Sequence, residues 1–280
     1  MKREDCTPIE LCGVIFYLGA SALFDHDFET VAPILEKAQS LTHRERMILI
    51  RNYKSSYHDS GKIEGATSCD SSCHGCEFCQ KMREAASEDI TIICGGCYDH
   101  SQEERWLNTE NRHKLNMVIM STVEFEEDEL AIIPVSEITR INSSGDIVNE
   151  IHARNMIKLC LAHPFIKFGF WAKHTAPVIR ACDELGKPQN VILIQSSIYI
   201  NKAAVLQKYF DYTFTVYATE EDLQNALRAG GCECNGKKCA DCGWKCYHGA
   251  WRKGSNICEL YRAPKKQIKR VIEALLQKTA

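Results

Sequence analysis

The sequence lacks an excess of charge of either sign, a long hydrophobic run and a glycine-rich nucleotide-binding motif. Its 34 basic and 37 acidic residues give a formal net charge of -3, so it has no basic field of the kind that attracts nucleic acid. The apolar stretch over residues 11–24 is too short to span a bilayer. Without a P-loop or Rossmann fingerprint, ATP and nicotinamide dinucleotides are not expected as cofactors. Neither a nucleic-acid partner nor a membrane partner is indicated.

The apolar stretch over residues 11–24 follows Lys2 and Arg3 and therefore has a faint likeness to a signal peptide. Glu4 and Asp5 neutralise the basic residues that would begin such a peptide. We therefore expect this stretch to be a buried strand or helix, and we expect the protein to be cytoplasmic.

What the chain of 280 residues does contain is sixteen cysteines, most of them in two tight clusters. Disulfide-rich scaffolds are typical of small secreted chains that lack a sufficient core. This chain is long, and its 45% hydrophobic content is enough for a core of one large or two small domains. Metal ligation is therefore the better interpretation of the clusters.

The C-terminal cluster contains the spacing C-x4-C-x2-C-x3-C, whose first three cysteines reproduce the plant-type ferredoxin loop. Gly236 and Gly243 permit the tight turns that such a loop needs. The pattern predicts a metal site, and iron-sulfur in particular. Its expected ligands are Cys234, Cys239, Cys242 and Cys246.

The N-terminal cluster can be divided in two incompatible ways. Its expected metal ligands are Cys69, Cys73, Cys76, Cys79, Cys94 and Cys97. The last four of these form two C-x2-C pairs separated by 14 residues, close to a zinc ribbon. The first three instead form C-x3-C-x2-C, the spacing with which radical S-adenosylmethionine enzymes leave one iron open. Zinc that holds the loops together is the structural alternative for both clusters.

From about residue 130 the sequence alternates short apolar runs with helical patterns, which is typical of βα units and a parallel sheet. Each unit takes about 25 residues, close to a TIM-type repeat, but only four or five units are visible. The expected fold class is therefore α/β, with a partial (β/α) TIM-like barrel and cysteine-rich segments at both ends. The expected strands cover 130–134, 138–142, 166–171, 191–195 and 212–217, and the expected helices cover 148–162, 176–185, 202–209 and 220–228.

Five parts of the chain are expected. They are an N-terminal α/β segment over 1–68, a cysteine-rich segment over 69–100, a βα core over 101–231, a cysteine loop over 232–250 and a C-terminal helix over 251–280. The first part has a helical pattern over 26–41, in which apolar residues fall on one face.

Polar residues follow the expected strands, and the carboxyl ends of parallel strands meet at one edge of a sheet. Asp146, Lys173 and His174 are the candidate catalytic residues, since Lys173 could hold an anionic group and His174 could bind substrate or transfer a proton. The candidate cofactor-binding residues are Ser144, Gly145, Gln195, Ser196 and Tyr217. In the structural alternative Asp146 and Thr175 cap helices, while Lys173 and His174 are solvated.

Several short motifs together resemble the phage gene product 88 family and its bacterial relatives. They are Cys94-Gly-Gly-Cys97-Tyr98, Arg140 with Ser144-Gly145-Asp146, residues 168–173, residues 214–217 and Cys239-x2-Cys242-x3-Cys246-Tyr247. The resemblance covers roughly residues 69–247. It implies a radical-SAM-like partial barrel with iron-sulfur clusters, in a family without an assigned activity.

This sequence departs from that family's pattern by having additional cysteines before Cys94, which suggests an additional cluster. The resemblance implies a shared cluster on Cys94 and Cys97 with Cys79 and Cys69.

Three functions compete on this basis. The first is a redox or radical-type enzyme with two or more 4Fe-4S clusters, a small-molecule substrate in a pocket near the strand ends, and S-adenosylmethionine as a further cofactor candidate. The second is an electron-transfer or sensing module with complete cysteine ligation and a redox partner. The third is a zinc-ribbon structural protein without redox chemistry. We expect the first.

Overall fold

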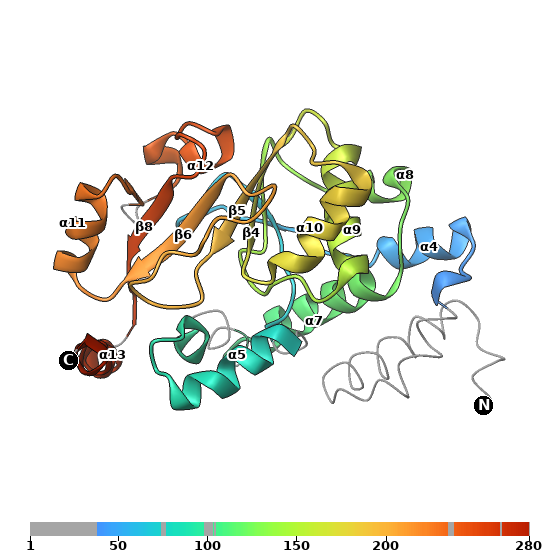
Figure 1. The fold of residues 1–280 in the computed structure, drawn as a ribbon. Helices are drawn as coiled ribbons and strands as arrows, with labels where there is room; N and C mark the ends of the chain where they lie inside the picture. Colours follow the sequence, from blue (N-terminus) through green and yellow to red (C-terminus); the bar gives the residue numbers. More distant parts are fainter. Residues whose placement is uncertain are drawn as a thin grey trace.

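The computed structural model describes residues 38–73, 77–97, 103, 105–234, 238–263 and 265–279. At its centre is an eight-stranded sheet in the order β1-β2-β3-β4-β5-β6-β8-β7 (Figure 1). The strands are β1 (Ser56–Tyr57), β2 (Thr67–Cys69), β3 (Ile138–Ile141), β4 (Lys167–Ala172), β5 (Val191–Ser196), β6 (Tyr212–Tyr217), β7 (Cys232–Glu233) and β8 (Asn256–Leu260). Only the β1–β2 pair is antiparallel in this sheet.

The sheet is open, because β1 and β7 form its two edges and do not pair with each other. The α/β class and the parallel pairing expected from the sequence are confirmed, whereas this strand order does not by itself establish a TIM-like barrel. The helices are α4 (His43–Ile50), α5 (Glu77–Glu88), α7 (Leu107–Thr122), α8 (Glu127–Leu130), α9 (Glu150–Ala162), α10 (Thr175–Leu185), α11 (Glu220–Arg228), α12 (Lys245–His248) and α13 (Lys265–Thr279), with short 3-10 helices η3 (Ile93–Gly96) and η4 (Ala240–Cys242).

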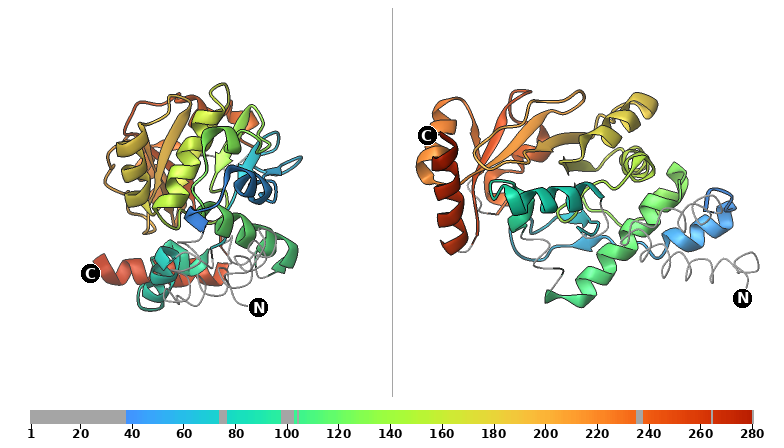
Figure 2. Two further views of the ribbon diagram at one scale, coloured as in Figure 1. Left: turned by 90° about the vertical axis from the view of Figure 1, so that its right-hand side faces the viewer. Right: turned by 60° about the horizontal axis from the view of Figure 1, so that its bottom comes forward.

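The two faces of the sheet carry different cores. Phe168 and Phe170 of β4 point to the face covered by α7, α9 and α10, and they lie in the main hydrophobic cluster. Trp171 points to the opposite face, because side chains alternate along a strand, and it packs there with Tyr247 of α12. We call these faces the helix face and the inner face. Figure 2 shows the sheet and its covering helices from two further sides.

Local capping explains where the core helices begin. The Asn149 side chain accepts a hydrogen bond from the His152 amide and starts α9. Thr219 does the same for α11 by accepting from the Asp222 amide. The structural alternative for Asp146 and Thr175 is therefore wrong, since Asn149 caps α9 and Thr175 is already the first residue of α10.

The predictions of a strand over 130–134 and of a helix over 202–209 are wrong. Residues 130–134 do not form a strand, because Glu126 and Glu129 make a capping box that starts α8 just before them. Residues 202–209 do not form a helix. Side chains of β5 and its exit hold this loop instead: Gln195 accepts from the Gln207 amide and Ser197 accepts from the Ala204 amide.

The sequence also missed β2 and β8. Strand β8 lies in the part over 251–280, whose C-terminal helix was expected over 264–277 and is confirmed as α13. Most of the helix expected over 26–41, and the whole apolar stretch over 11–24, lie outside the described residues. Within the described residues, no helix is both long enough and apolar enough to cross a membrane.

His152 on α9 makes the stability of this fold depend on pH. Its side chain is fully buried, and its Nδ1 accepts a hydrogen bond from the Val148 amide at 3.3 Å. Burial lowers the pKa of His152 to about 3. The unfolded chain binds a proton at this residue near pH 6.5, which the folded chain does not bind until about pH 3. Stability is therefore lost as the pH falls through this window.

When the pH falls from 7 to 5, we expect the protonation of His152 in the unfolded chain to lower the unfolding free energy of the wild-type protein by about 2 kcal/mol. The variant His152→Gln should lack this part of the pH dependence, even though it loses some packing. Urea denaturation at the two pH values measures the difference. Equal slopes of stability against pH in the two proteins would contradict the assignment.

Candidate functional site

The exits of β2 and β3 are joined by one buried carboxylate at the carboxyl edge of the sheet. Asp70 follows β2, and its Oδ1 accepts hydrogen bonds from the Ser143 amide at 2.8 Å and the Ser144 amide at 3.0 Å. The Ser143 hydroxyl donates to the same oxygen at 2.6 Å. The Ser68 hydroxyl donates to Oδ2. Asp70 therefore fixes the turn that follows β3.

Asp146 joins the exits of β3 and β4 in the same way. Its Oδ2 accepts from the Lys173 amide at 2.8 Å and from the His174 amide at 3.3 Å. Its Oδ1 accepts from the Ile147 amide. Asp146, a candidate catalytic residue, is only 2% exposed, and its carboxylate binds three backbone amides.

Gly145 sits between these two carboxylates with a φ of +76°, where the chain passes very close to the loop after β2. A Cβ on Gly145 would lie 2.2 Å from the Ser71 carbonyl oxygen. Ser71 in turn donates its hydroxyl to the Asp146 carbonyl at 2.9 Å. Only glycine satisfies both the backbone conformation and the contact.

The N-terminal cysteine segment lies across this edge. Its second half is tied to the exit of β5, since the Ile93 amide donates to the Ile198 carbonyl and the Ile200 amide donates to the Thr91 carbonyl, both at 2.9 Å. Its first half, α5, is tied to the exit of β4, since the Phe78 ring stacks on His174 with 5.0 Å between ring centroids. The His174 Nδ1–H donates to the Ile147 carbonyl at 2.9 Å. Figure 1 shows α5 below the sheet, on the side where β8 ends.

Lys173 is a cation that lies near several cysteines of this segment. Burial lowers the pKa of the Lys173 amine, but four acidic groups outweigh burial and raise the pKa above its ordinary value. In decreasing order of effect they are Cys94, Asp146, Cys97 and Cys79. Three of the predicted metal ligands and the candidate catalytic residue Asp146 therefore lie near enough to Lys173 for their charges to act on its amine. We call Cys79, Cys94 and Cys97 the edge thiols.

Cys69 lies apart from the edge thiols. It is fully buried in the main core on the helix face. Burial raises its thiol pKa to about 12, and the neighbouring Tyr53 hydroxyl acts in the opposite direction. Its charge also affects the pKa of the buried Cys160. The expectation that Cys69 shares a site with Cys79, Cys94 and Cys97 is thus not favoured by its position.

Cys73 is buried and held by a polar network, whereas Cys76 lies outside the described residues. Glu103 accepts hydrogen bonds from the Cys73 amide at 3.3 Å and the Ser72 hydroxyl at 3.0 Å. Its other oxygen is paired with His113 of α7 at 2.8 Å. Nothing in the sequence pattern connected Glu103 and His113 with the cysteines, because they are not themselves in a motif.

The C-terminal cysteine segment covers the inner face and forms a second group. The pKa of Cys246 is raised first by burial and then by the charges of the other three. We call this group the inner thiols: Cys234, Cys239, Cys242 and Cys246. The segment is anchored by the Cys239 amide, which donates to the Lys62 carbonyl at 2.7 Å. Lys62 also forms an ion pair with Glu259 of β8 at 2.7 Å, across the inner face from β2.

Arg140 of β3 supplies positive charge to the inner thiols. Its guanidinium carbon lies 4.3 Å from the centre of the Trp171 ring. Its charge lowers the pKa of both Cys239 and Cys246, although burial is the larger effect in each case and raises the pKa. For Cys239 the charge of Lys62 lowers the pKa more than that of Arg140 does. Each of the two thiol groups is therefore accompanied by a cation, Lys173 at the edge and Arg140 on the inner face.

Two of the three remaining candidate residues, Gln195 and Tyr217, have structural partners. Gln195 holds the loop after β5. Tyr217 accepts from the Asn256 amide group at 3.0 Å and packs with Leu223 and Cys258. Ser196 ends β5 and is half-buried. None of these contacts of Gln195 and Tyr217 is with an edge thiol.

Two observations bear on whether the edge could hold a bound group. Among the described residues, no three or more His, Cys, Asp or Glu side chains are grouped so as to hold a single metal ion. Ser144 Oγ and Asn142 Oδ1, both at the exit of β3, are buried without a hydrogen-bond partner in the described structure. A buried polar atom without a partner is costly, so these two atoms suit a site that binds a further group.

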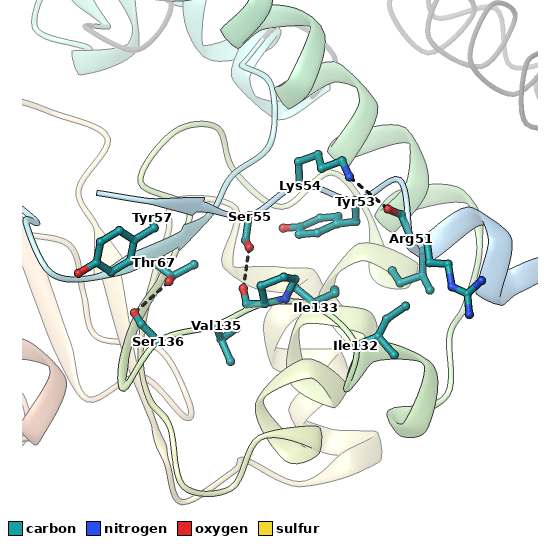
Figure 3. Close-up of a pocket in the computed structure, with 12 residues that line it drawn as sticks. Arg51, Tyr53, Lys54, Ser55, Tyr57, Thr67, Ile132, Ile133, Val135 and Ser136 are labelled. Atoms are coloured by element: carbon teal, nitrogen blue, oxygen red, sulfur yellow. Dashed lines mark hydrogen bonds between the residues drawn. The ribbon is translucent and has the colours of Figure 1, made fainter. Parts of the chain in front are cut away.

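A cavity of about 570 Å³ lies near the amino ends of β2 and β3, away from both thiol groups (Figure 3). Its walls are joined by the Ser55 hydroxyl, which donates to the Pro134 carbonyl at 2.6 Å, and by Thr67, which donates to Ser136 at 2.9 Å. Figure 3 shows both hydrogen bonds between residues that line the cavity. It contains none of the residues predicted for the site.

Comparison with known proteins gives one match. A family model described as Gene product 88 matches residues 35–263. No curated protein matches the chain, and no solved structure matches it.

We expect Gly145→Ala to destabilise the protein by roughly 3 kcal/mol or more, because it combines backbone strain with a clash against the Ser71 carbonyl. The matched control is Gly61→Ala. Gly61 also has a positive φ, of +85°, but a Cβ there would meet no atom within 4 Å. The control should lose about 1 kcal/mol. Chemical denaturation measures both, and equal losses would show that the contact between the two exits is not tight.

Proposed function

The chain belongs to the Gene product 88 family, and from this premise we propose that it is an iron-sulfur protein whose two thiol groups each bind a cluster, and that it is a redox or radical-type enzyme. The observation that carries the proposal is the pairing of each thiol group with a buried or stacked cation. Deprotonated thiolates concentrate negative charge, and a cation nearby offsets it.

The chemistry of the donors supports iron-sulfur over zinc. Burial raises the pKa of Cys239 to about 11, so the thiol stays protonated at neutral pH unless a metal displaces the proton. A structural zinc ion would draw four thiolates around one point. The cysteines of a polynuclear cluster bind different irons and stand further apart. The spacing C-x4-C-x2-C of the first three inner thiols, which is that of a plant-type ferredoxin loop, favours the second arrangement.

When bound, an iron-sulfur cluster supplies one-electron transfer. The chain's own residues would then divide the work. The edge thiols would hold the cluster and Lys173 would offset its charge, while Asp146 fixes the backbone of Lys173 so that the amine stays in place. Ser144 and Asn142 have polar atoms for a substrate or a cofactor such as S-adenosylmethionine at the same edge. This arrangement resembles an open-site enzyme more than a purely structural metal site.

Removing one pair of thiols from each group tests the proposal. We expect Cys79→Ser/Cys94→Ser and Cys239→Ser/Cys242→Ser each to lose about half of the iron and acid-labile sulfide in protein purified without oxygen, because each pair serves one cluster. The control is Cys182→Ala in α10, whose thiol belongs to neither group. Zinc without sulfide in the wild-type protein would contradict the proposal, and so would full iron content in both variants.

Arg140 gives a second test that does not depend on activity. A positive charge favours the reduced, more negative cluster, so Arg140→Gln should lower the midpoint potential of the inner-face centre. We expect a fall of roughly 50–100 mV, or about 1–2 kcal/mol for one electron. Arg140→Lys keeps the charge and should shift the potential less. A redox titration followed by electron paramagnetic resonance measures both, and an unchanged potential in Arg140→Gln would refute this role.

A further inference from the structure

Helix α13 begins with an unusual concentration of positive charge. Its first six residues include four cations, Lys265, Lys266, Lys269 and Arg270, and its first turn has no acidic residue. The amino end of a helix carries the positive end of its dipole, so cations there oppose helix stability. Helix α11 has the ordinary arrangement, with Glu220, Glu221 and Asp222 in its first turn. The basic start of α13 is therefore not explained by the helix itself.

This basic end of α13 lies directly against the loop that carries two edge thiols. A Cβ on Gly96 would come within 2.0 Å of Gln267 Nε2 and 2.3 Å of the Tyr261 hydroxyl. Gln267 donates to that hydroxyl at 3.1 Å. Cys97 is near enough for its charge to raise the pKa of Tyr261, an effect second to burial. Figure 2 shows α13 beside α5 at this end of the molecule.

The surface between the loop and the helix is a shallow cavity of about 530 Å³. Of the described residues that line it, only Lys266 and Arg270 are charged. Both side chains are exposed, and neither forms an ion pair with another described residue. Gly95, which also lines the cavity, is exposed, and Cys97 is half-buried. Gly95 and Gly96, the two residues between Cys94 and Cys97, thus line the cavity together with two exposed cations.

We infer that this surface, formed by Gly95, Gly96, Lys266 and Arg270, is the docking site of an acidic one-electron carrier protein. The inference rests on the proposed function, because it requires a cluster at the edge thiols. One electron would leave the metal centre of the reduced carrier, oxidising it, and would reduce the cluster that Cys79, Cys94 and Cys97 would hold. No proton or bond changes in the step.

Charge complementarity selects this partner over others. The whole chain carries a formal net charge of -3, so the positive surface is local and not part of a general basic field. A local patch steers an acidic protein to one place and speeds its association, while a small contact area lets it leave after transfer. An apolar or basic partner would gain nothing from these cations.

The test uses the full chain, purified without oxygen, and an acidic [2Fe-2S] ferredoxin as the probe. Stopped-flow absorbance follows electron transfer between the two proteins in the downhill direction, as a function of salt. We expect Lys266→Gln/Arg270→Gln to transfer electrons about tenfold more slowly at low salt, with a weaker salt dependence. Dithionite, a small reductant that needs no docking site, should reduce the variant at the wild-type rate.

The matched control is Arg252→Gln/Lys253→Gln, which removes two exposed charges before β8, at the opposite edge of the sheet. It should transfer electrons at the wild-type rate. Equal rates in all three proteins, or a slower rate in this control alone, would overturn the docking inference and leave the proposed clusters standing. Absence of iron and sulfide from the wild-type protein would overturn both.

Discussion

Two buried carboxylates, Asp70 and Asp146, fix the backbone at the carboxyl edge of the sheet, where the candidate site lies. Each follows one strand and accepts the backbone amides that follow the next strand. Because these bonds are to a charged acceptor and are buried, they are stronger than ordinary amide bonds and costly to break. These bonds connect the exits of β2, β3 and β4 in turn. They fix the backbone of Lys173, whose amine lies near the edge thiols.

The two cysteine segments use the sheet in different ways. The edge thiols lie over the strand ends, with contacts to the exits of β4 and β5. The inner thiols lie on the face opposite α7, α9 and α10, and their loop is joined to the β1–β2 loop and to β8 through Lys62. The ion pair between Lys62 and Glu259 thus links the two ends of the sheet, which strand pairing would join in a closed barrel. The open sheet leaves room for the second cysteine loop.

Sequence reasoning found the parts of the site that lie in regular patterns. The repeated βα units predicted β3 to β6 and the helices α9, α10 and α11. The cysteine spacings selected the members of both thiol groups, whose role as metal ligands stays a prediction. It missed β2, because three residues are too few for a periodic signal, and with β2 it missed the role of Asp70. It assigned chemistry to Asp146, Gln195 and Tyr217 from their places at strand ends. The hydrogen bonds of the folded chain show that each of these side chains also has a structural partner, which the sequence pattern could not predict.

The central claim is that iron occupies two separate thiol groups, one beside Lys173 and one beside Arg140. Anomalous diffraction from crystals of protein purified without oxygen, recorded on both sides of the iron and zinc absorption edges, tests this most directly. The account predicts iron signals at two positions, one among Cys79, Cys94 and Cys97 and one among the inner thiols. A zinc signal at either position, or iron at neither, would contradict it.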